Sequence, residues 1–464
     1  MKTIFILIYD GDTEKNILRS GTLDILKKAN LRVVLLIRKS KDFDKLSYYK
    51  EHFADKNILV EEIPSAMTRF EYYMYHLSWN TLPTKSARVK RHDLYLVHKN
   101  RLRYFAESLV GLMGKFSIWR NIIRALYYWI PDNYCEELFE KYKPELVFAV
   151  NMFSAEDCRI LRLARKRGIK TLTMAKSWDV PTTRGFTRVK ADRILVFNEI
   201  NKKEIIEIGD YSPEKVFVVG FPQFDVYSKN ETYVSKEEFF KHIRADSDKR
   251  LILFAVPGDF KNPFSHEIME DLNEAIETGK IKNVQVLARF HPKYPSKGEE
   301  LKGLKNFIMD RPGTYFSNKM EGALDAPQSS AFQWTYTDKD IKHLANSIKH
   351  SDLVINTEST MTLDAVAHDK PIVLIGFDGR QRLEYSRSII RNYSREHLKE
   401  VLETGGAKLA KSNNDLVHYI NSYLENPHTD EKGRELMRKR LLYKLDGQSS
   451  KRIAMNIINM LESK

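Results

Sequence analysis

The chain has 464 residues, of which 42% are hydrophobic and 30% charged, and it carries a formal net charge of +14 at pH 7. This length and composition predict two ordinary globular domains, and no apolar run approaches the ~20 residues of a membrane span. The positive charge predicts an anionic partner. Because basic residues lie dispersed among acidic ones and no nucleic-acid-binding motif is present, we exclude nucleic acid as that partner.

The first part of the chain alternates strands and helices. Thr3–Tyr9 and Arg32–Ile37 have the apolar character of buried strands, and an amphipathic helix that ends near Ala29 lies between them. This β-α-β unit implies a parallel sheet with a right-handed crossover. Further strands complete an open, doubly wound α/β domain and are expected at Ile58–Ile63, Pro144–Val150 and Lys170–Ala175.

A helical segment at about residues 66–140 interrupts this alternation. It is rich in Tyr, Phe and Trp, with Arg and Lys interleaved. Basic amphipathic helices attach to anionic lipid, so the segment predicts an acceptor-binding insertion or a contact with an anionic membrane surface. Aromatic helices also commonly pack a core, and that alternative stays open.

The second half repeats the architecture without repeating the sequence. Strands are expected at Arg193–Phe197, Lys215–Val219, Arg250–Val256, Val284–Phe290, Leu353–Ile355 and Pro371–Ile375. We therefore expect an N-terminal domain over residues 1–205, which contains the insertion, and a C-terminal domain over 206–440. A last helix over 441–464 is a candidate to return to the N-terminal domain.

The stretch Ser351–Asp378 predicts a phosphate cradle. An apolar strand is followed by a small polar turn, Asn356–Thr360, and by a short helix. Ser359 and Thr360 fall where that helix begins, and there the backbone N–H groups, the positive dipole end and two hydroxyls suit a phosphate. Ser and Thr also cap helices in any protein, a role that is compatible with phosphate binding.

A cationic motif ends the predicted strand Val284–Phe290. Arg289, His291 and Lys293 flank Pro292, which fixes the turn. The three basic side chains suit the phosphates of a nucleotide donor. A strand-end His that only caps a loop is the alternative.

Four more residues join the predicted donor site. Glu358 is expected to accept hydrogen bonds from a sugar or ribose hydroxyl, because a carboxylate repels a diphosphate. Gly220 and Gln223 lie in a turn where glycine allows close backbone approach to a ligand. Trp334 offers a stacking surface for a nucleobase. An ordinary loop exit and a buried core tryptophan are the alternatives for these last features.

The N-terminal domain offers three carboxylates for general-base catalysis. Asp179 follows a predicted strand, and Asp10 and Asp12 follow the first strand. Lys176 and Arg184 can offset charge on the acceptor or the leaving group. Helix capping is the alternative for each carboxylate. We expect no metal and no other cofactor, so the positive charge of the site comes from basic side chains and a helix terminus.

Four stretches together resemble the bacterial surface-polysaccharide glycosyltransferases of GT-B fold, a superfamily that includes the CDP-glycerol glycerophosphotransferases of teichoic acid synthesis. They are Ser177–Gly185, Gly220–Asp225, Arg289–Pro292 and Asn356–Pro371. The resemblance implies an α/β protein with two Rossmann-like domains that face a central cleft, the donor bound by the C-terminal domain and the acceptor by the N-terminal one. The His-Pro pair is also similar to that of bacterial sialyl and Kdo transferases, where it binds the nucleotide.

One element departs from the family pattern. In the glycerophosphotransferases a W-H-G element supplies a catalytic His, whereas this chain has Trp178-Asp179-Val180 at the corresponding place. The departure makes Asp179 the candidate base for sugar transfer.

These observations predict an inverting, metal-independent glycosyltransferase that moves a sugar from a nucleotide-sugar to a cell-surface glycan or a lipid-linked acceptor. The alternatives are a non-hydrolysing UDP-sugar 2-epimerase, a CDP-glycerol-type glycerophosphotransferase and a non-catalytic sugar-nucleotide-binding protein. Cys135 and Cys158 belong to no C-x-x-C pair, which fits the cytoplasm. The aromatic and basic insertion predicts a peripheral position on the inner face of the cell membrane.

Overall fold

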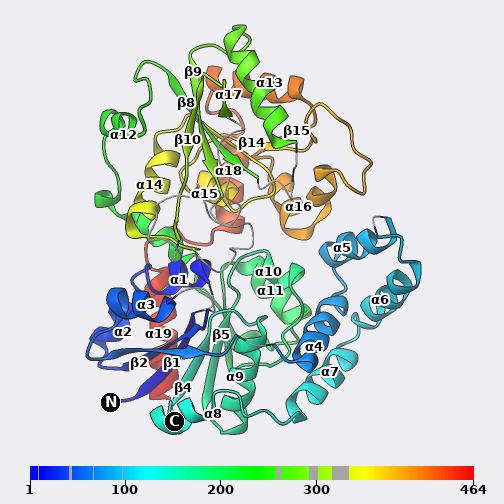
Figure 1. Cartoon of the computed structure of the whole chain (residues 1–464), viewed down its shortest axis with the longest axis vertical. Coiled ribbons are helices and arrows are strands. Elements are labelled where there is room, and N and C mark those ends of the chain that lie inside the picture. The colour runs from blue at the N-terminus through cyan, green and yellow to red at the C-terminus, as the bar shows by residue number, and fades with distance from the viewer. Residues whose placement is uncertain are drawn as a thin grey trace. The chain divides into compact units, whose positions relative to one another are not determined.

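The computed structural model describes residues 1–8, 10–40, 44–65, 67–96, 98–257, 262, 264–291, 301–315 and 334–463 (Figure 1). The chain divides into two compact units, and each holds its own parallel sheet. The first unit consists of Met1–Asp225 together with Tyr443–Lys464, and the second of Val226–Leu442.

The first unit is built on a seven-stranded sheet in the order β3-β2-β1-β4-β5-β6-β7, and all neighbouring strands are parallel. Its strands are apolar and buried because helices cover both faces. The strands are β1 (Thr3–Ile8), β2 (Arg32–Arg38), β3 (Ile58–Ile63), β4 (Leu146–Ala149), β5 (Lys170–Met174), β6 (Arg193–Val196) and β7 (Val216–Val218).

The helices of the first unit fall into three groups by position in the chain. Those that connect the first three strands are α1 (Gly11–Ile17), α2 (Thr22–Lys28) and α3 (Lys45–Phe53). The insertion between β3 and β4 contains α4 (Arg69–Asn80), α5 (Lys85–Leu96), α6 (Arg101–Met113), α7 (Ser117–Trp129) and α8 (Glu136–Tyr142), so the helical character predicted for this segment is present. The remaining helices are α9 (Ala155–Lys166), α10 (Val180–Thr183), α11 (Glu199–Glu207) and α19 (Ser449–Glu462).

The second unit has a six-stranded parallel sheet in the order β10-β9-β8-β13-β14-β15. Its strands are β8 (Arg250–Val256), β9 (Val284–Phe290), β10 (Phe307–Asp310), β13 (Leu353–Asn356), β14 (Ile372–Ile375) and β15 (Lys408–Ala410), and β11 (Thr314–Tyr315) pairs separately with β12 (Trp334–Thr335). The helices are α12 (Lys236–Ile243), α13 (Ser265–Glu277), α14 (Asp338–Lys349), α15 (Met361–Ala367), α16 (Glu396–Glu403), α17 (Asn413–Glu425) and α18 (Glu431–Leu441).

Both sheets follow the Rossmann strand order, in which the direction of progress reverses beside the first strand of the domain. The predicted α/β fold with two Rossmann-like domains is therefore confirmed. The reversal places a topological switch point between β1 and β4 in the first unit and between β8 and β13 in the second. In open α/β sheets, ligands bind beyond the carboxyl ends of the strands at such points.

One strand belongs to a different unit than the sequence indicated, whereas the last helix belongs to the first unit, as the sequence analysis expected. We expected the C-terminal domain to start at residue 206, but β7 pairs with β6 and is the last strand of the first sheet. The chain leaves this unit after Asp225, whose carboxylate accepts hydrogen bonds from the backbone N–H groups of Ser449 (3.0 Å) and Ser450 (2.7 Å) at the start of α19. This helix contacts α2, β4 and β5 (Figure 1).

Among the described helices, none combines the length and the apolar character that a bilayer-crossing segment needs.

Candidate functional site

The carboxyl edge of the second sheet carries most of the predicted donor residues. Arg289 lies at the end of β9 and His291 directly follows it, while Glu358, Ser359 and Thr360 follow β13. These two strands flank β8, so the residues lie on either side of the switch point. Lys293 lies outside the described residues.

Arg289 is buried and forms an ion pair through Nη1 with the carboxylate of Asp310 at the end of β10. The other oxygen of Asp310 contacts Nε2 of His343 at 3.1 Å. Burial raises the pKa of Asp310, but the charges of Arg289 and His343 outweigh it and hold the pKa at about 2. Arg289 is thus a permanent, oriented cation within the sheet.

The register of the strands places Arg289 and Asn356 on one face of the sheet. Arg289 lies opposite Ala255 of β8, and the pairing of Ile355 with Phe254 brings Asn356 level with the same Ala255 on the other side. Neighbouring strands are ~4.8 Å apart, so the two backbones are separated by roughly 10 Å. A diphosphate with its attached groups spans a gap of this size.

Several buried hydrogen-bond donors at this edge have no acceptor among the described residues. They are Nη2 of Arg289, Nδ2 of Asn356, Nδ2 of Asn262 and Nε1 of Trp334. Buried polar groups almost always have partners, because an unpaired donor costs about 1–3 kcal/mol. All four atoms are donors, so the complementary ligand is rich in acceptor oxygens.

Asn356, Asn262 and Asp310 were not among the predicted site residues. Asn356 stood in the sequence as the first residue of the expected turn, and the structure makes it the buried last residue of β13. Its Oδ1 accepts a hydrogen bond from the hydroxyl of Thr362 at 3.0 Å, which turns its Nδ2 outward from that bond. The sequence did carry one sign of this role, because Asn356 is a polar residue directly after the apolar strand residues Leu353–Ile355.

Ser359 and Thr360 immediately precede α15, as the sequence predicted. The first amides of the helix are already used locally, because the N–H of Met361 donates to Oγ of Ser359 (3.3 Å) and that of Leu363 to the carbonyl of Thr360 (2.8 Å). Thr360 is the N-cap residue without a side-chain capping bond. This turn therefore offers a ligand the hydroxyls of Ser359 and Thr360 rather than a row of helix amides.

Glu358 and Trp334 are held by neighbouring side chains. Oε1 of Glu358 accepts a hydrogen bond from Nδ2 of Asn392 at 3.1 Å. Trp334 is buried and packs edge-on against the rings of His291 (6.1 Å between centroids) and Tyr336 (4.8 Å). Trp334 therefore supports His291, and its burial argues against the expected role as an open stacking surface.

Gly220 and Gln223 lie in the first unit and not in the donor-type sheet. Gly220 has a φ of +81°, and a methyl group placed there would lie 2.7 Å from Oγ of Ser449. The close approach that requires glycine is thus made by the segment leading into α19 rather than by a ligand. Gln223 lies in the 3-10 helix Pro222–Ser228 of the same connection.

The carboxyl edge of the first sheet brings together Asp10, Asp12 and Lys176. Nζ of Lys176 lies 2.5 Å from Oδ2 of Asp10 and 3.9 Å from Oδ2 of Asp12. Burial lowers the pKa of Lys176, but the two carboxylates outweigh it and raise the pKa overall, against the opposing charge of Arg184. Asp10 and Asp12 form a D-x-D run, and the ammonium group of Lys176 occupies the position between their carboxylates.

Asp10 and Asp179 differ in how their carboxylates are engaged. Oδ1 of Asp10 accepts from the N–H of Thr13 at 3.1 Å and caps α1, so both of its oxygens are occupied. Asp179 is partly exposed and precedes α10, and its carboxylate accepts from the hydroxyl of Thr183 at 3.3 Å. The geometry favours a structural role for Asp10.

Two further ionisable residues at this edge were missed by the sequence analysis. Lys45 at the start of α3 is buried, and burial lowers its pKa to about 8 despite the nearby charge of Asp10. Asp157 in α9 is also buried, and burial raises its pKa to about 7 although it accepts from the N–H of Asn151 and the hydroxyl of Ser154. Neither residue belongs to a motif, so the sequence carried no signal for them.

Within the part of the chain that the structure describes, no group of three or more His, Cys, Asp or Glu side chains is arranged to hold a metal ion.

Comparison with known families gives a match to the C-terminal part of the chain. A family profile described as CDP-Glycerol:Poly(glycerophosphate) glycerophosphotransferase matches residues 187–459, which is more than half of the sequence. The chain belongs to this family. The glycerophosphotransferase profile covers Arg289, His291 and the Asn356–Thr360 turn but begins after Asp179. No curated protein sequence matches the chain significantly.

Solved structures show the same fold at low sequence identity. A putative UDP-N-acetylglucosamine 2-epimerase from Listeria monocytogenes has a TM-score of 0.57 at 13% identity, covering 100% of this chain and 97% of that one. The S. aureus MnaA–UDP co-structure has a TM-score of 0.55 at 13% identity, covering 99% and 97%. The wall teichoic acid polymerase TagF has a TM-score of 0.50 at 13% identity, covering 99% and 89%. This glycerophosphotransferase-family chain thus shares its architecture with proteins of several activities.

Proposed function

We propose that this chain is a transferase that takes a sugar from a nucleotide-sugar donor and delivers it to a hydroxyl group of a cell-surface glycan or a lipid-linked acceptor. The observation that carries the proposal is the set of buried, unsatisfied donors at the carboxyl edge of the second sheet. Phosphate oxygens supply the acceptors that these donors need. The UDP and UDP-GlcNAc complexes among the structural neighbours support a nucleotide-sugar as the ligand.

Each donor-site residue has a part in this proposal. Arg289 is held by Asp310, so its Nη2 points a fixed positive charge at the leaving phosphate, and Nδ2 of Asn356 binds an oxygen from the other side of β8. His291 and the hydroxyls of Ser359 and Thr360 add hydrogen bonds at the rim. These groups stabilise the negative charge that develops on the departing nucleotide.

The acceptor hydroxyl needs a base, and Asp179 is the proposed one. Its carboxylate takes the acceptor proton as the oxygen attacks the anomeric carbon, the bond from that carbon to the phosphate oxygen breaks, and the nucleotide leaves with the bonding electrons. Attack opposite to the leaving group inverts the anomeric configuration. Lys176 and Arg184 offset charge near the acceptor, and no metal is required in this scheme.

Glycerophosphate transfer is the second candidate, and the family membership favours it. That reaction breaks a phosphorus–oxygen bond and releases CMP. The resemblance assigns a catalytic His of a W-H-G element to that reaction, and this chain has Asp179 at the corresponding place. The Trp178-Asp179-Val180 element therefore supports sugar transfer over glycerophosphate transfer.

The phosphorus-containing product separates the two reactions. We would incubate the protein with a panel of nucleotide-sugars and with CDP-glycerol, each with a glycan acceptor, and follow the products by 31P NMR. Sugar transfer releases a nucleoside diphosphate, or CMP from a CMP-sugar donor together with a new glycosidic bond. Glycerophosphate transfer would instead release CMP from CDP-glycerol and add glycerol phosphate to the polymer. If this occurs and no sugar donor is turned over, glycerophosphate transfer replaces sugar transfer as the proposed function.

The epimerase alternative needs no acceptor, so a UDP-sugar incubated alone and followed by 1H NMR gives its epimer only if that activity is present.

Asp179→Asn tests the base. We expect transfer to fall by about 100-fold or more while nucleotide affinity stays unchanged, because a general base contributes roughly 10²–10⁴-fold. Turnover equal to that of the unaltered protein would remove Asp179 from the mechanism.

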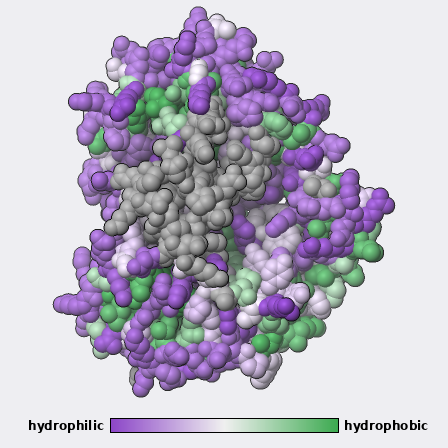
Figure 2. All heavy atoms as spheres, in the orientation of Figure 1, coloured by the Kyte–Doolittle hydropathy of each residue, from purple (hydrophilic) through white to green (hydrophobic). Residues whose placement is uncertain are grey.

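We place the reaction at the inner face of the cell membrane, in the cytoplasm, where nucleotide-activated donors meet lipid-linked acceptors. The helical insertion supports this placement, because large apolar side chains such as Leu102 and Trp129 are exposed on α6 and α7. Figure 2 shows hydrophobic residues over these two helices at the lower right of the view.

A further inference from the structure

The segment that carries Asp179 has little regular structure of its own. Asp179 is the N-cap residue of α10, a helix of only four residues. Within the segment, the N–H of Val180 donates to the carbonyl of Ser177 at 3.2 Å, and that of Arg184 donates to the carbonyl of Val180 at 3.1 Å. An isolated helical turn is unstable, because it fixes several residues for each hydrogen bond that it gains. The conformation of this segment therefore depends on contacts from outside it.

Two side chains of the helical insertion hold the end of α10. Nε1 of Trp79, in α4, donates to the carbonyl of Thr183 at 3.0 Å, and Oγ1 of Thr84, just before α5, donates to the carbonyl of Thr182 at 2.8 Å. Both donor residues are buried. The last carbonyls of a helix have no partner inside it. Trp79 and Thr84 supply donors to two of these carbonyls.

Two asparagines outside the insertion hold the part of the segment that precedes α10. Nδ2 of Asn16 in α1 donates to the carbonyl of Lys176 at 3.1 Å, and Nδ2 of Asn201 in α11 donates to the carbonyl of Trp178 at 2.7 Å. Both asparagines are 2% exposed. Asp179 thus lies between two pairs of buried anchors, and only the second pair belongs to the insertion.

The carboxylate of Asp179 contacts the same residue that Trp79 anchors. Oγ1 of Thr183 lies 3.3 Å from Oδ2 of Asp179 and 3.0 Å from its carbonyl oxygen. Any displacement of Thr183 moves the hydroxyl that contacts the carboxylate. The N–H of Trp79 therefore acts on Asp179 through a single intervening residue.

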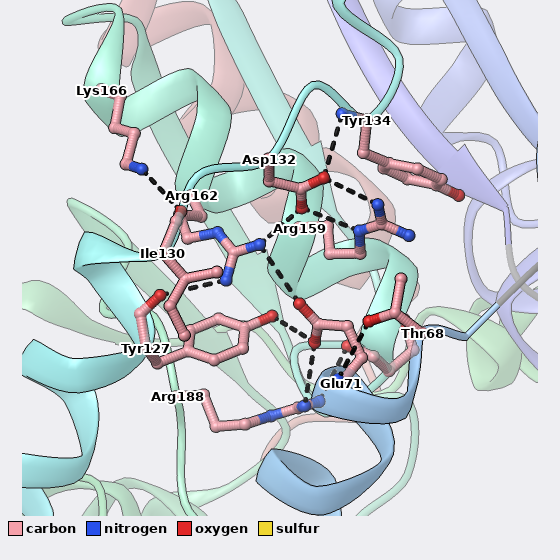
Figure 3. A network of polar contacts seen from close by, with 11 residues as sticks. Thr68, Glu71, Tyr127, Ile130, Asp132, Tyr134, Arg159, Arg162, Lys166 and Arg188 are labelled. Carbon is pink, nitrogen blue, oxygen red and sulfur yellow. Dashed lines mark hydrogen bonds and ion pairs between the residues drawn. The ribbon is translucent and has the colours of Figure 1, made fainter.

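A buried polar network fixes α4, and with it Trp79, to the rest of the first unit (Figure 3). The hydroxyl of Tyr127 donates to Glu71 of α4 at 2.7 Å, and Arg162 of α9 donates to the other oxygen of Glu71 at 3.2 Å. Arg188 contacts Glu71 at 3.7 Å. Helix α9 itself contacts β4 and β5. Trp79 follows Glu71 by about two helical turns, so the sheet holds its N–H in place through α9 and α4.

We propose that Trp79 and Thr84 are positioning residues for Asp179, which orient its carboxylate toward the acceptor hydroxyl by holding the carbonyls of Thr182 and Thr183. This assignment rests on the proposed function, in which Asp179 is the general base. A base must lie within hydrogen-bond reach of the proton that it takes, and a misplacement of about 1 Å can cost roughly 100-fold in rate. The insertion then contributes to the chemical step as well as to the contacts with acceptor and membrane.

Removing each donor while keeping most of the side chain tests the assignment. Trp79→Phe keeps an aromatic ring and loses the N–H, and Thr84→Val keeps the shape and loses the hydroxyl. Trp119→Phe in α7 is the control for the first variant, because the buried Nε1 of Trp119 has no acceptor among the described residues. Thr404→Val in the second unit is the control for the other. Oγ1 of Thr404 donates to a carbonyl at 2.7 Å and accepts from a backbone N–H at 3.2 Å, as Oγ1 of Thr84 does at 2.8 Å and 3.2 Å.

Hydrogen exchange of a peptide that covers residues 177–184 measures the anchoring independently of activity. We expect the amides of this peptide to exchange about fivefold faster in Trp79→Phe and in Thr84→Val, because the turn loses the net contribution of one buried hydrogen bond. Both control variants should exchange here like the unaltered protein. Unchanged exchange in both test variants overturns the assignment, whether or not the proposed function is correct.

Steady-state kinetics measure the effect on the chemical step, with whichever donor the chain turns over, a nucleotide-sugar or CDP-glycerol. Both test variants should lower kcat by about tenfold to 100-fold and leave the KM for the donor unchanged. Thr84→Ser keeps the hydroxyl and should turn over like the unaltered protein. In the Asp179→Asn background, Trp79→Phe should cost less than about twofold more, because no carboxylate remains to be oriented. A general structural defect would instead multiply the two losses.

The outcomes separate this assignment from the proposed function. If Asp179→Asn is inactive while both test variants turn over like their controls, or if the losses multiply in the Asp179→Asn background, the positioning role is refuted and Asp179 remains the base. If Asp179→Asn turns over like the unaltered protein, Asp179 leaves the mechanism and the positioning role is refuted with it. The same holds if the unaltered protein turns over no donor at all.

Discussion

Replacing Asp310 by Asn should destabilise the second unit strongly, because it removes the charge that compensates a buried arginine. Arg289 and Asp310 are 5% and 7% exposed, and their ion pair joins β9 to β10. The pKa of Asp310 is held at about 2, against about 3.9 in an unfolded chain. This difference alone corresponds to roughly 2–3 kcal/mol of folding free energy near neutral pH. Removal of one partner of a buried pair costs about 3–5 kcal/mol, because the other charge stays behind.

The assay is a urea titration read by hydrogen exchange of peptides that cover β9 and β10, so that the unit that unfolds is identified. Arg380→Gln is the control in the same unit, because it breaks exposed contacts with Glu270 and Asp271 and should cost less than about 1 kcal/mol. The double variant Arg289→Met/Asp310→Leu should lose less than Asp310→Asn, since an apolar pair leaves no buried charge. Because the pKa of Asp310 is lower in the folded protein than in the unfolded chain, its contribution to the free energy of unfolding is fully present above about pH 4 and is lost as the pH falls through about 2. A cost for Asp310→Asn no larger than that of Arg380→Gln would refute the reasoning.

Three more predictions concern the first unit. Lys45 has a folded pKa of about 8 against an ordinary value of 10.5, so the unfolded chain binds more protons between these values and stability should rise with pH there. Lys45→Met should stabilise the protein by roughly 3 kcal/mol near pH 7, and this gain should vanish above about pH 10.5 in urea titrations. Asp157 has a folded pKa of about 7 against 3.8, so stability should fall by roughly 2–4 kcal/mol as the pH rises between them. Asp157→Asn should flatten this dependence in thermal unfolding at several pH values, and an unchanged slope would exclude the residue as its source. Gly220→Ala should cost about 1–3 kcal/mol more than Gly168→Ala. Both glycines have a positive φ, but an added methyl group meets a close neighbour, Oγ of Ser449, at Gly220 and none of the described residues at Gly168. Equal melting temperatures for the two variants would contradict this.

Most of the sheet architecture could be read from the sequence because its strands are buried on both faces. Such strands are continuous apolar runs, and β3, β8 and β9 have the bounds that the sequence predicted. The missed strands β10 and β15 are short and lie at the two edges of the second sheet, where Met309 and Lys408 are only partly buried or exposed. An edge strand has less apolar character, so its pattern is weaker. Pairing also decided the place of β7, and a local pattern carries no information on pairing.

The candidate site was predictable where a motif marks a strand end and unpredictable where tertiary contacts set the role of a residue. The positions of Arg289, His291 and Ser359 at the carboxyl edge followed from the strand pattern. The partner of Arg289 did not, because Asp310 lies on a strand that the sequence did not reveal. Likewise, the salt bridge of Asp10 with Lys176 joins residues that are far apart in the sequence, so the strand pattern did not predict that the carboxylate of Asp10 is engaged by a lysine.

The capping of α19 by Asp225 has a consequence for the order of assembly during synthesis. The first unit receives its last helix only after the whole second unit has left the ribosome, because residues 226–442 are threaded between its two parts. Until then β4 and β5 lack the helix that contacts them. The nascent chain therefore carries an incompletely covered parallel sheet for most of translation, the kind of intermediate that chaperones bind.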